Sequence, residues 1–443
     1  MRKLIVFAAL LLVPATQDAQ EPVILISIDG LMPDQLLNPA HYDLKIPNLQ
    51  RLLAEGTSAT GVKGVLPTVT YPSHTTMITG APPAKHNILA NTPFDPLSKN
   101  HDGWYWYAED IKVETLWDAA RKSGMTTGNV EWPVSVGAPI DFNIVQYWRA
   151  ELPEDVKVIR ALSTPGLLTE AEKIIGARYP NGNDYSIAAD ERRSAFDTFI
   201  IERKRPRFMT IYFSGLDDVQ HETMPGSAES RAALEVIDGL VGRVRSAAES
   251  IGGDHAIVCV VSDHGFARTD KELHLNSALR DAGLIRLDDA GKVSAWEANS
   301  WNSSGGLGAI VLRNPQDASV CDRVRAVLQK FNDDTARPIH RILEGAEART
   351  TGGFPSATFV VGLRPPFRTG GDLRGPFIRD GKSRGGHGYL PDLPEMNSSF
   401  VIAGREIPAG RALGIIDMRD IAPTLAGVLG LELPSAEGRN LLH

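Results

Sequence analysis

The sequence predicts an α/β fold in which a doubly wound, mostly parallel sheet carries a small inserted subdomain. Three apolar runs have the length and β-branched content of buried parallel strands: residues 23–28, 208–213 and 256–261. Helical patterns lie between them, as the crossovers of a parallel sheet require. Asp29, Asp217 and Asp263 lie at or just past the ends of these runs. Because open α/β sheets bind ligands beyond the carboxyl ends of their strands, we expect the three carboxylates on one edge.

Five further segments have the pattern of helices. The first, 47–55, begins with a proline and is followed by Gly56, a combination that favours a helix start and a helix stop. The others are residues 114–123, 187–203, 227–250 and 419–429. Gly124 and Gly430 follow the second and the last of these helices. The order of strands and helices therefore supports the doubly wound arrangement.

A long segment separates Asp263 and His264 from His387. Residues 270–384 begin with a predicted helix, 273–282, continue with strand-like and helical pieces, and include glycine- and proline-rich stretches. We interpret this segment as an inserted subdomain folded onto the edge of the sheet, within one domain that spans 21–443.

The N-terminus has the pattern of a secretory signal peptide. Arg2 and Lys3 precede an apolar run at 4–13, which is too short to span a bilayer. We assign residues 1–19 to the signal, with cleavage somewhere within 15–20; an N-terminal membrane anchor is the alternative. The mature chain is then expected to be exported, either periplasmic or secreted. No later stretch of the sequence is long and apolar enough to suggest a membrane span.

Charge and cysteine content limit the possible partners. A net charge of −8 argues against a general nucleic-acid-binding or anionic-membrane-binding surface. Export would permit a disulfide between Cys259 and Cys321. However, Cys259 lies in a predicted strand and Cys321 in a helical pattern at 320–331, so we expect two buried free thiols.

Seven residues have side chains suited to holding two metal ions around one nucleophile. They are Asp29, Thr70, Asp217, His221, Asp263, His264 and His387. The three aspartates and an ionised threonine would balance two divalent cations, with the histidines as neutral ligands. Oxygen and imidazole ligands without thiolate favour two Zn²⁺ ions over manganese or iron. Two metals about 4 Å apart can hold both oxygens of an in-line phosphoryl displacement. No single piece is specific, and the prediction rests on their combination.

The segment 66–80, LPTVTYPSHTTMITG, contains the candidate nucleophile. We expect a strand-like approach to Pro72 and a short helix from Ser73 or soon after. A hydroxyl there would lie near a helix N-terminus, which favours an anion. The candidates are Thr68, Thr70, Ser73, Thr75 and Thr76, and chemistry alone does not choose among them. For Ser73 a helix cap is the better interpretation. Metal coordination would lower the pKa of the chosen hydroxyl.

Taken together, these segments resemble the nucleotide pyrophosphatase/phosphodiesterase family of the alkaline phosphatase superfamily. The resemblance runs from Val23 over nearly the whole remaining chain. Residues 70–74, Thr-Tyr-Pro-Ser-His, match the family's Thr-aromatic-Pro-x-His segment, whose threonine is the nucleophile. Residues 85–96 match its asparagine loop, and by position the asparagine that donates to a phosphoryl oxygen is Asn91. Residues 415–424 match its closing helix.

This resemblance implies an alkaline-phosphatase-like phosphodiesterase domain over 21–443 and a division of the ligands between two metals. One metal would take Asp29, Thr70, Asp263 and His264, and the other Asp217, His221 and His387. By position, Tyr71 and Tyr212 would contact the substrate, with Tyr212 stacking on a nucleobase. Tyr212 is equally well interpreted as a sheet residue. The aromatic run 104–107 either lines the pocket rim or packs internally.

Two departures from the family pattern bear on specificity. Gln220 stands where the family usually has glycine, and the turn at Trp132-Pro133 continues Val-Ser-Val instead of Gly-Ser. Both positions are expected to flank the substrate pocket more than the metals. The identity of the substrate therefore stays open.

The predicted function is metal-dependent hydrolysis of phosphodiester or pyrophosphate bonds in a small molecule, most naturally a nucleotide. The alternatives are a phosphomonoesterase on the same scaffold, a lysophospholipid-type phosphodiesterase, and a binding protein that lost catalysis. Monoesterases of the superfamily place an extra Arg or Lys over the phosphoryl oxygens, and residues 128–146 contain neither. The absence of a Cys-x-Pro-x-Arg segment argues against a sulfatase. Oligomeric state is not predicted.

Overall fold

A mixed, mostly parallel sheet forms the centre of the computed structural model, which describes residues 21–101, 103–149, 152–302 and 305–442. Its eight strands lie in the order β18-β2-β17-β7-β1-β6-β4-β5. Their bounds are β1 (Val23–Ile28), β2 (Gly56–Ser58), β4 (Thr127–Val130), β5 (Phe142–Ile144), β6 (Phe208–Phe213), β7 (Ile257–Val261), β17 (Phe400–Ala403) and β18 (Arg411–Ala412). Only β17 runs antiparallel to its neighbours. The predicted fold class is confirmed. The predicted signal peptide, 1–19, lies outside the described residues.

The three apolar runs become adjacent central strands. β1 pairs in parallel with β6 on one side and β7 on the other, and Val23 lies opposite both Phe208 and Ile257. Because the three strands start in register and run in one direction, the chain leaves them at the same edge of the sheet. Asp29 follows β1 directly, and Asp263 follows one residue after β7.

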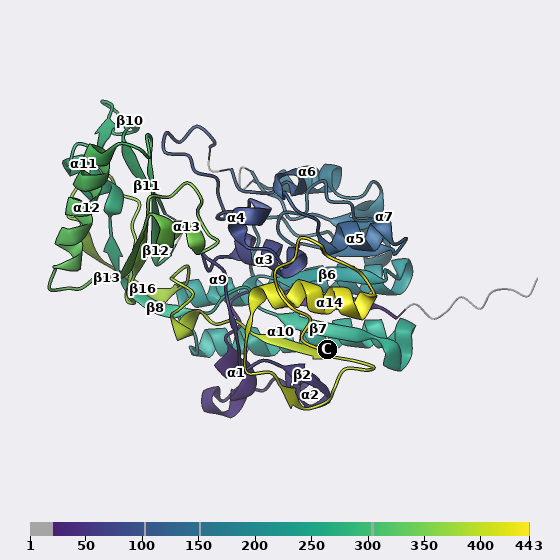
Figure 1. The fold of residues 1–443 in the computed structure, drawn as a ribbon. Coiled ribbons are helices and arrows are strands. Elements are labelled where there is room, and N and C mark those ends of the chain that lie inside the picture. The colour runs from purple at the N-terminus through teal and green to yellow at the C-terminus, as the bar shows by residue number, and fades with distance from the viewer. Residues whose placement is uncertain (1–20, 102, 150–151, 303–304, 443) are drawn as a thin grey trace, which may run out of the picture.

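Helices cover both faces of the sheet (Figure 1). Side chains alternate along β1, so Ile24, Ile26 and Ile28 join one hydrophobic cluster while Val23 and Leu25 join another. The first cluster includes residues of α2 (Pro47–Glu55), α8 (Ile187–Phe199) and α10 (Ala228–Gly252). The second includes residues of α3 (Thr70–Thr79), α5 (Leu116–Lys122) and α14 (Ile421–Leu429). The predicted helices are present, with ends that differ by a few residues.

The segment predicted to be an inserted subdomain supplies its own sheets and helices. A four-stranded antiparallel sheet has the order β11-β12-β14-β13, and β8 lies between β15 and β16 in another. The bounds are β8 (Ala267–Leu273), β11 (Ala298–Asn302), β12 (Leu307–Leu312), β13 (Ile339–Glu344), β14 (Phe359–Leu363), β15 (Phe367–Thr369), β16 (Ile378–Gly386), α11 (Leu275–Asp281) and α12 (Ala318–Asn332). Figure 1 shows most of these elements beside the central sheet, and they share a third hydrophobic cluster. The domain boundaries stay a prediction.

The remaining α-helices of the described residues are α1 (Pro33–Leu37), α4 (Pro83–His86), α6 (Asp155–Leu162), α7 (Leu167–Ile175), α9 (Gly215–Glu222) and α13 (Ala346–Thr350). Two small pairs of strands complete the fold: β9 (Ile285–Leu287) with β10 (Val293–Trp296), and β3 (Gly61–Lys63) with β19 (Ile415–Asp417). Among the helices described, none combines the length and hydropathy of a membrane span.

Three sequence predictions are wrong in detail. The helix expected from Ser73 begins at Thr70, because proline is tolerated in the first turn of a helix and Pro72 is the third residue of α3. The helix expected from Leu273 begins at Leu275, since Leu273 is the last residue of β8. Both cysteines are free, as expected, but Cys321 is half-buried, because it packs at the margin of the third hydrophobic cluster and not inside it.

Candidate metal centre and active site

All seven predicted metal ligands meet at the carboxyl edge of the central strands. Asp29 and Asp263 follow β1 and β7, and α9 presents Asp217 and His221 one turn apart on one face. β16 pairs antiparallel with β8 and so returns His387 to the neighbourhood of His264. Five of the seven residues line a pocket of about 450 Å³: Asp29, Thr70, Asp217, His221 and His387.

The ligand atoms form two overlapping groups. Those of Asp29, Asp263 and His264 lie within 4.8 Å of one another, and so do those of Asp217, His264 and His387. The first group agrees with the predicted division of ligands. The second differs from it because the ring of His264 stacks on that of His387, with centroids 3.6 Å apart, and so lies between the two groups. His221 joins the second group, with its Nε2 3.4 Å from Oδ2 of Asp217.

The three histidines are held in one orientation relative to the cluster. In each, Nδ1 lies 3.2 Å from a backbone carbonyl oxygen: Gly385 for His221, Gly265 for His264 and Thr68 for His387. Because a carbonyl oxygen only accepts, Nδ1 carries the proton and Nε2 keeps its lone pair. Such contacts fix the tautomer and the ring orientation of metal-binding histidines. Nε2 of His221 and Nε2 of His387 are only 3.1 Å apart, an arrangement that suits a shared cation.

Gly385 is required for this arrangement. A Cβ atom at this position would lie 2.4 Å from the backbone carbonyl oxygen of Gln220 in α9. The close contact between β16 and α9 brings the carbonyl of Gly385 to His221. A glycine in the Arg-Gly-Gly-His segment therefore has a steric role in building the cluster.

Four buried ligand atoms have no partner among the described residues. They are Oδ1 of Asp29, Oδ1 of Asp217, Oδ2 of Asp263 and Nε2 of His264. Nε2 of His264 lies 3.3 Å from that oxygen of Asp29 and 3.2 Å from that oxygen of Asp263. Buried polar atoms are nearly always paired, so a cluster of unpaired acceptors indicates a missing donor or cation. Divalent cations fit this set of oxygen and nitrogen atoms.

The electrostatics of the cluster lead to the same conclusion. Burial, followed by repulsion from Asp217 and Asp263, raises the pKa of Asp29 well above its usual value. Burial likewise raises the pKa of Asp217 to about 6. Burial, followed by a neighbouring histidine, lowers the pKa of His387 well below its usual value. The described residues that line the pocket include neither Lys nor Arg. Ionised carboxylates at neutral pH therefore need a cation that the side chains do not provide.

The structure distinguishes among the five candidate hydroxyls. Thr68, Thr75 and Thr76 each donate to a backbone carbonyl, those of Tyr389, Tyr71 and Ala81. Ser73 is fully buried, is not a helix cap, and does not line the pocket. Thr70 is the first residue of α3 and lines the same pocket as the metal cluster. Of the five candidate hydroxyls, that of Thr70 is the one whose residue lines this pocket.

Asn91 also lies in this pocket, beside the start of α3. Its Oδ1 accepts a hydrogen bond from the backbone N–H of Tyr71 at 3.0 Å. This contact fixes the amide, and its Nδ2 donates no hydrogen bond to any described residue. A free donor next to Thr70 suits an oxygen of a bound phosphoryl group.

Neither of the two tyrosines predicted to contact the substrate has the surroundings expected of it. Tyr212 is 5% exposed, its ring packs edge-on against His74, and its hydroxyl donates to Oδ2 of Asp29. Tyr71 is 1% exposed, and its hydroxyl donates to Gln146. Stacking of Tyr212 on a base stays a prediction, while its contact with Asp29 gives it a role in orienting that ligand.

Further pocket residues were missed or left open by the sequence. Trp104, Gln146, Trp148, Asn183, Tyr185 and Asp218 complete most of the lining. All but Asp218, which is in α9, come from loops that are distant in the sequence from the metal ligands, so no local spacing identifies them. The aromatic run 104–107 does both things considered for it: Trp104 lines the pocket, whereas Trp106 is buried in the core.

The expectation that Gln220 flanks the substrate pocket is wrong. Its side chain is fully buried, and its Nε2 donates to the carbonyl of Gly30, next to Asp29. The N–H of Gly30 in turn donates to Oδ1 of Asp263. Gln220 therefore supports the backbone next to Asp29, which in turn holds the carboxylate of Asp263. Trp132 is likewise buried, packed edge-on against His74.

Comparison with known proteins places this architecture in a family. The family model described as "Type I phosphodiesterase / nucleotide pyrophosphatase" matches residues 23–360. Human ectonucleotide pyrophosphatase/phosphodiesterase family member 1 is 24% identical over 282 residues, which are 60% of this chain and 26% of that protein. The chain thus spans about a quarter of the length of that relative. Mouse bis(5'-adenosyl)-triphosphatase enpp4 is 23% identical over 97% of this chain and 82% of its own length.

Solved structures show the same fold. Human ectonucleotide pyrophosphatase/phosphodiesterase 5 superposes with a TM-score of 0.67 over 95% of this chain and 99% of its own, at 18% identity. Its murine counterpart gives a TM-score of 0.66 over 94% of this chain and 97% of its own, at 19% identity.

Proposed function

This chain belongs to the type I phosphodiesterase/nucleotide pyrophosphatase family, and we propose that it hydrolyses phosphodiester or pyrophosphate bonds at the cluster described above. Thr70 is the proposed nucleophile, and two zinc ions are the proposed cofactors. The observation that carries the proposal is the set of four unpartnered ligand atoms beside the pocket that Thr70 lines. Removing the metals with a chelator should abolish turnover, and restoring zinc should recover it.

The proposed reaction has two displacement steps at phosphorus, and both involve Thr70. Oγ1 of Thr70 attacks phosphorus in line as the bond to the leaving oxygen breaks, which gives a phosphothreonine that keeps the other substituent. Water then attacks the same phosphorus and releases Thr70, so two in-line displacements give net retention. Bound zinc would lower the pKa of the threonine hydroxyl and offset charge on the phosphoryl oxygens. Nδ2 of Asn91 donates to a non-bridging oxygen.

Nucleotides are the first substrate class to test. The mouse relative is named as a bis(5'-adenosyl)-triphosphatase, and the pocket of about 450 Å³ has Trp104, Trp148 and Tyr185 in its lining. A panel of nucleotide diesters, dinucleoside polyphosphates and lysophospholipids separates the nucleotide proposal from the lysophospholipid alternative. Turnover of lysophospholipids alone would exclude nucleotides as the substrate.

A diester should be preferred over the matching monoester. A monoester dianion carries one more negative charge than a diester, and no Lys or Arg lines the described pocket to offset it. We therefore expect a higher kcat/KM for bis-p-nitrophenyl phosphate than for p-nitrophenyl phosphate, measured in the same zinc-loaded preparation. A preference for the monoester would instead support a phosphomonoesterase.

Base recognition should depend more on Trp104 than on Tyr212. The hydroxyl of Tyr212 is bonded to Asp29, whereas Trp104 is partly exposed in the pocket. Stacking contributes about 1–3 kcal/mol per aromatic residue. Trp104→Ala is therefore expected to raise KM for a nucleotide p-nitrophenyl diester about tenfold while sparing methyl p-nitrophenyl phosphate.

Tyr212→Phe provides the comparison. It keeps the ring and removes the hydroxyl that holds Asp29, so it is expected to slow both substrates to a similar degree. A selective loss with the nucleotide ester in the Tyr212 variant, and none in the Trp104 variant, would return the stacking role to Tyr212.

A further inference from the structure

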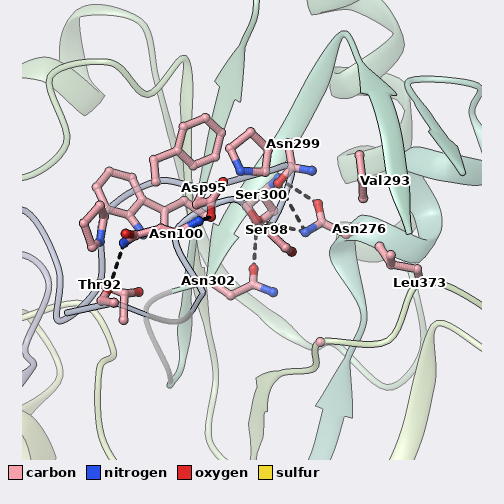
Figure 2. A pocket seen from close by; sticks show the side chains of 16 residues that line it. Thr92, Asp95, Ser98, Asn100, Asn276, Val293, Asn299, Ser300, Asn302 and Leu373 are labelled. Atoms are coloured by element: carbon pink, nitrogen blue, oxygen red, sulfur yellow. Dashed lines mark hydrogen bonds between the residues drawn. The ribbon is translucent and has the colours of Figure 1, made fainter. Parts of the chain in front are cut away.

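A second cavity, of about 270 Å³, lies on the other side of the loop between Asn91 and Trp104. One wall is this loop, and the other comes mainly from β11, α11 and the chain near Leu373 (Figure 2). None of the seven predicted metal ligands, Thr70 included, lines it. The cavity is therefore distinct from the proposed active site.

The lining of this cavity is polar, and its one charged group among the described residues is the carboxylate of Asp95. Four asparagines contribute to it: Asn100, Asn276, Asn299 and Asn302. Thr92, Ser98 and Ser300 add hydroxyls. Asp95 is the one ionisable residue in the described lining, and its carboxylate accepts hydrogen bonds from the backbone N–H groups of Leu97, Lys99 and Asn100 in its own loop. An anionic ligand would find no opposite charge in the described lining, and the one carboxylate is already hydrogen-bonded within its own loop.

Two of these asparagines, Asn276 and Asn302, form hydrogen bonds within the protein, whereas the side-chain N–H group of a third, Asn299, donates to no described residue. Asn276 donates to the carbonyl of Ser300 and accepts from its N–H, which fixes α11 to β11. Asn302 donates to the carbonyl of Gly370. Asn299 is only 4% exposed, yet its Nδ2 donates to no described residue, and its Oδ1 has one long contact of 3.5 Å with Asn276. Nδ2 of Asn299 is not among the buried atoms that lack a partner, so it is reached from the cavity and can donate to an oxygen of a ligand there.

Apolar rings complete the lining. Phe94 of the loop and Trp301 of β11 both line the cavity, with ring centroids 5.6 Å apart. The cavity lining therefore combines neutral amide and hydroxyl groups with aromatic rings. An amide both donates and accepts, and so does an alcohol. Ligand sites typically join an apolar surface with a few placed polar groups in this way.

From this lining we propose that the cavity binds an uncharged, hydroxyl-rich ring, a saccharide unit, with Nδ2 of Asn299 donating to one of its oxygens. The cavity is of a size for one such ring. The loop that forms its wall is closed by the N–H of Tyr105 donating to the carbonyl of Asn91 at 3.1 Å. Both ends of this loop, Asn91 and Trp104, line the proposed active site. The saccharide is either a substituent of the phosphodiester substrate or a separate ligand.

Direct binding tests the site without relying on catalysis. Saturation-transfer NMR and calorimetry would use glucose, N-acetylglucosamine and maltose with the full chain. We expect saturable binding of at least one, weakened about tenfold or more in Asn299→Ala, because a buried hydrogen bond is lost. Asn332→Ala is the matched control, since Asn332 is exposed at the end of α12. Absence of binding in the wild-type protein, or equal binding in both variants, would overturn the proposal.

A second variant closes the cavity without touching Asn299. A Cβ added at Gly371, which lines the cavity, meets nothing within 4 Å, so Gly371→Leu places a side chain in open space. It should abolish saccharide binding while unfolding temperature and hydrolysis of methyl p-nitrophenyl phosphate stay at wild-type values. Retained binding in a folded Gly371→Leu protein would contradict the proposal.

The same variant distinguishes the two sources of the saccharide. If the ring belongs to the substrate, glucose 1-(p-nitrophenyl phosphate) should have a lower KM than methyl p-nitrophenyl phosphate, and Gly371→Leu should remove the difference. If the ring is a separate ligand, the two esters should have similar KM values, and free saccharide should bind to protein saturated with either one.

Discussion

Thr70→Ala is expected to lower kcat by about a thousandfold or more, because it removes the group that forms the covalent intermediate. Thr70 is the candidate hydroxyl that lines the pocket, whereas three of the other four donate to backbone carbonyls. The measurement is steady-state turnover of bis-p-nitrophenyl phosphate, alongside zinc content, which separates loss of the nucleophile from loss of metal.

Two further variants test whether the loss of activity is specific to the hydroxyl of Thr70. Ser73→Ala should retain most activity, since Ser73 is fully buried and outside the pocket lining. Thr70→Ser keeps the hydroxyl and should recover part of the lost rate. Near-normal turnover in Thr70→Ala together with an inactive, folded Ser73→Ala protein would transfer the role to Ser73. Trapping of a phosphorylated chain in wild-type protein, absent in Thr70→Ala, would support the covalent step directly.

The framework of the site was predictable because it follows from general rules of α/β folds. Parallel strands end at one edge, so Asp29 and Asp263 could be placed together from apolar runs alone. Asp217 and His221 are four residues apart, a spacing that places both on one face of a helix. His387 is different. Its return depends on the pairing of β16 with β8, which no local pattern indicates, so the sequence offered only its residue type and the resemblance to a family.

Most of the errors originate in side-chain packing between distant segments. Gln220 was assigned to the pocket from its place in a motif, but the structure turns it toward the carbonyl of Gly30. Tyr212 has the alternating pattern of a strand residue, and the sequence does not show that its hydroxyl reaches Asp29. Trp148 and Tyr185 come from two loops whose positions depend on the whole fold. The start of α3 was misplaced because proline was interpreted as a boundary when it can also occupy a first turn.

Metal content should respond to the two ligand groups separately. We expect about two zinc ions per wild-type chain. Asp217→Ala should empty the site shared with His387, and Asp263→Ala the site shared with Asp29. His264→Ala should weaken both, because its Nε2 belongs to both groups. Elemental analysis after dialysis checks this, with Asp218→Ala as a control that changes an adjacent carboxylate outside both groups. Full occupancy in the Asp217, Asp263 and His264 variants would refute the assignment.

Removing the metals should also change how stability depends on pH. In the metal-free protein, burial raises the pKa of Asp217 from 3.8 to about 6. A carboxyl whose pKa is raised by folding favours the folded state when it is protonated, so its contribution is lost as pH rises from about 4 through about 6. Protein treated with a chelator should therefore unfold at a lower temperature at pH 7 than at pH 5. Zinc should reverse this trend, because its ligands bind in their deprotonated forms and its affinity grows with pH. Calorimetric scans of both forms at the two pH values measure the effect, and parallel pH profiles with and without zinc would show that the buried carboxylates do not bind the metal.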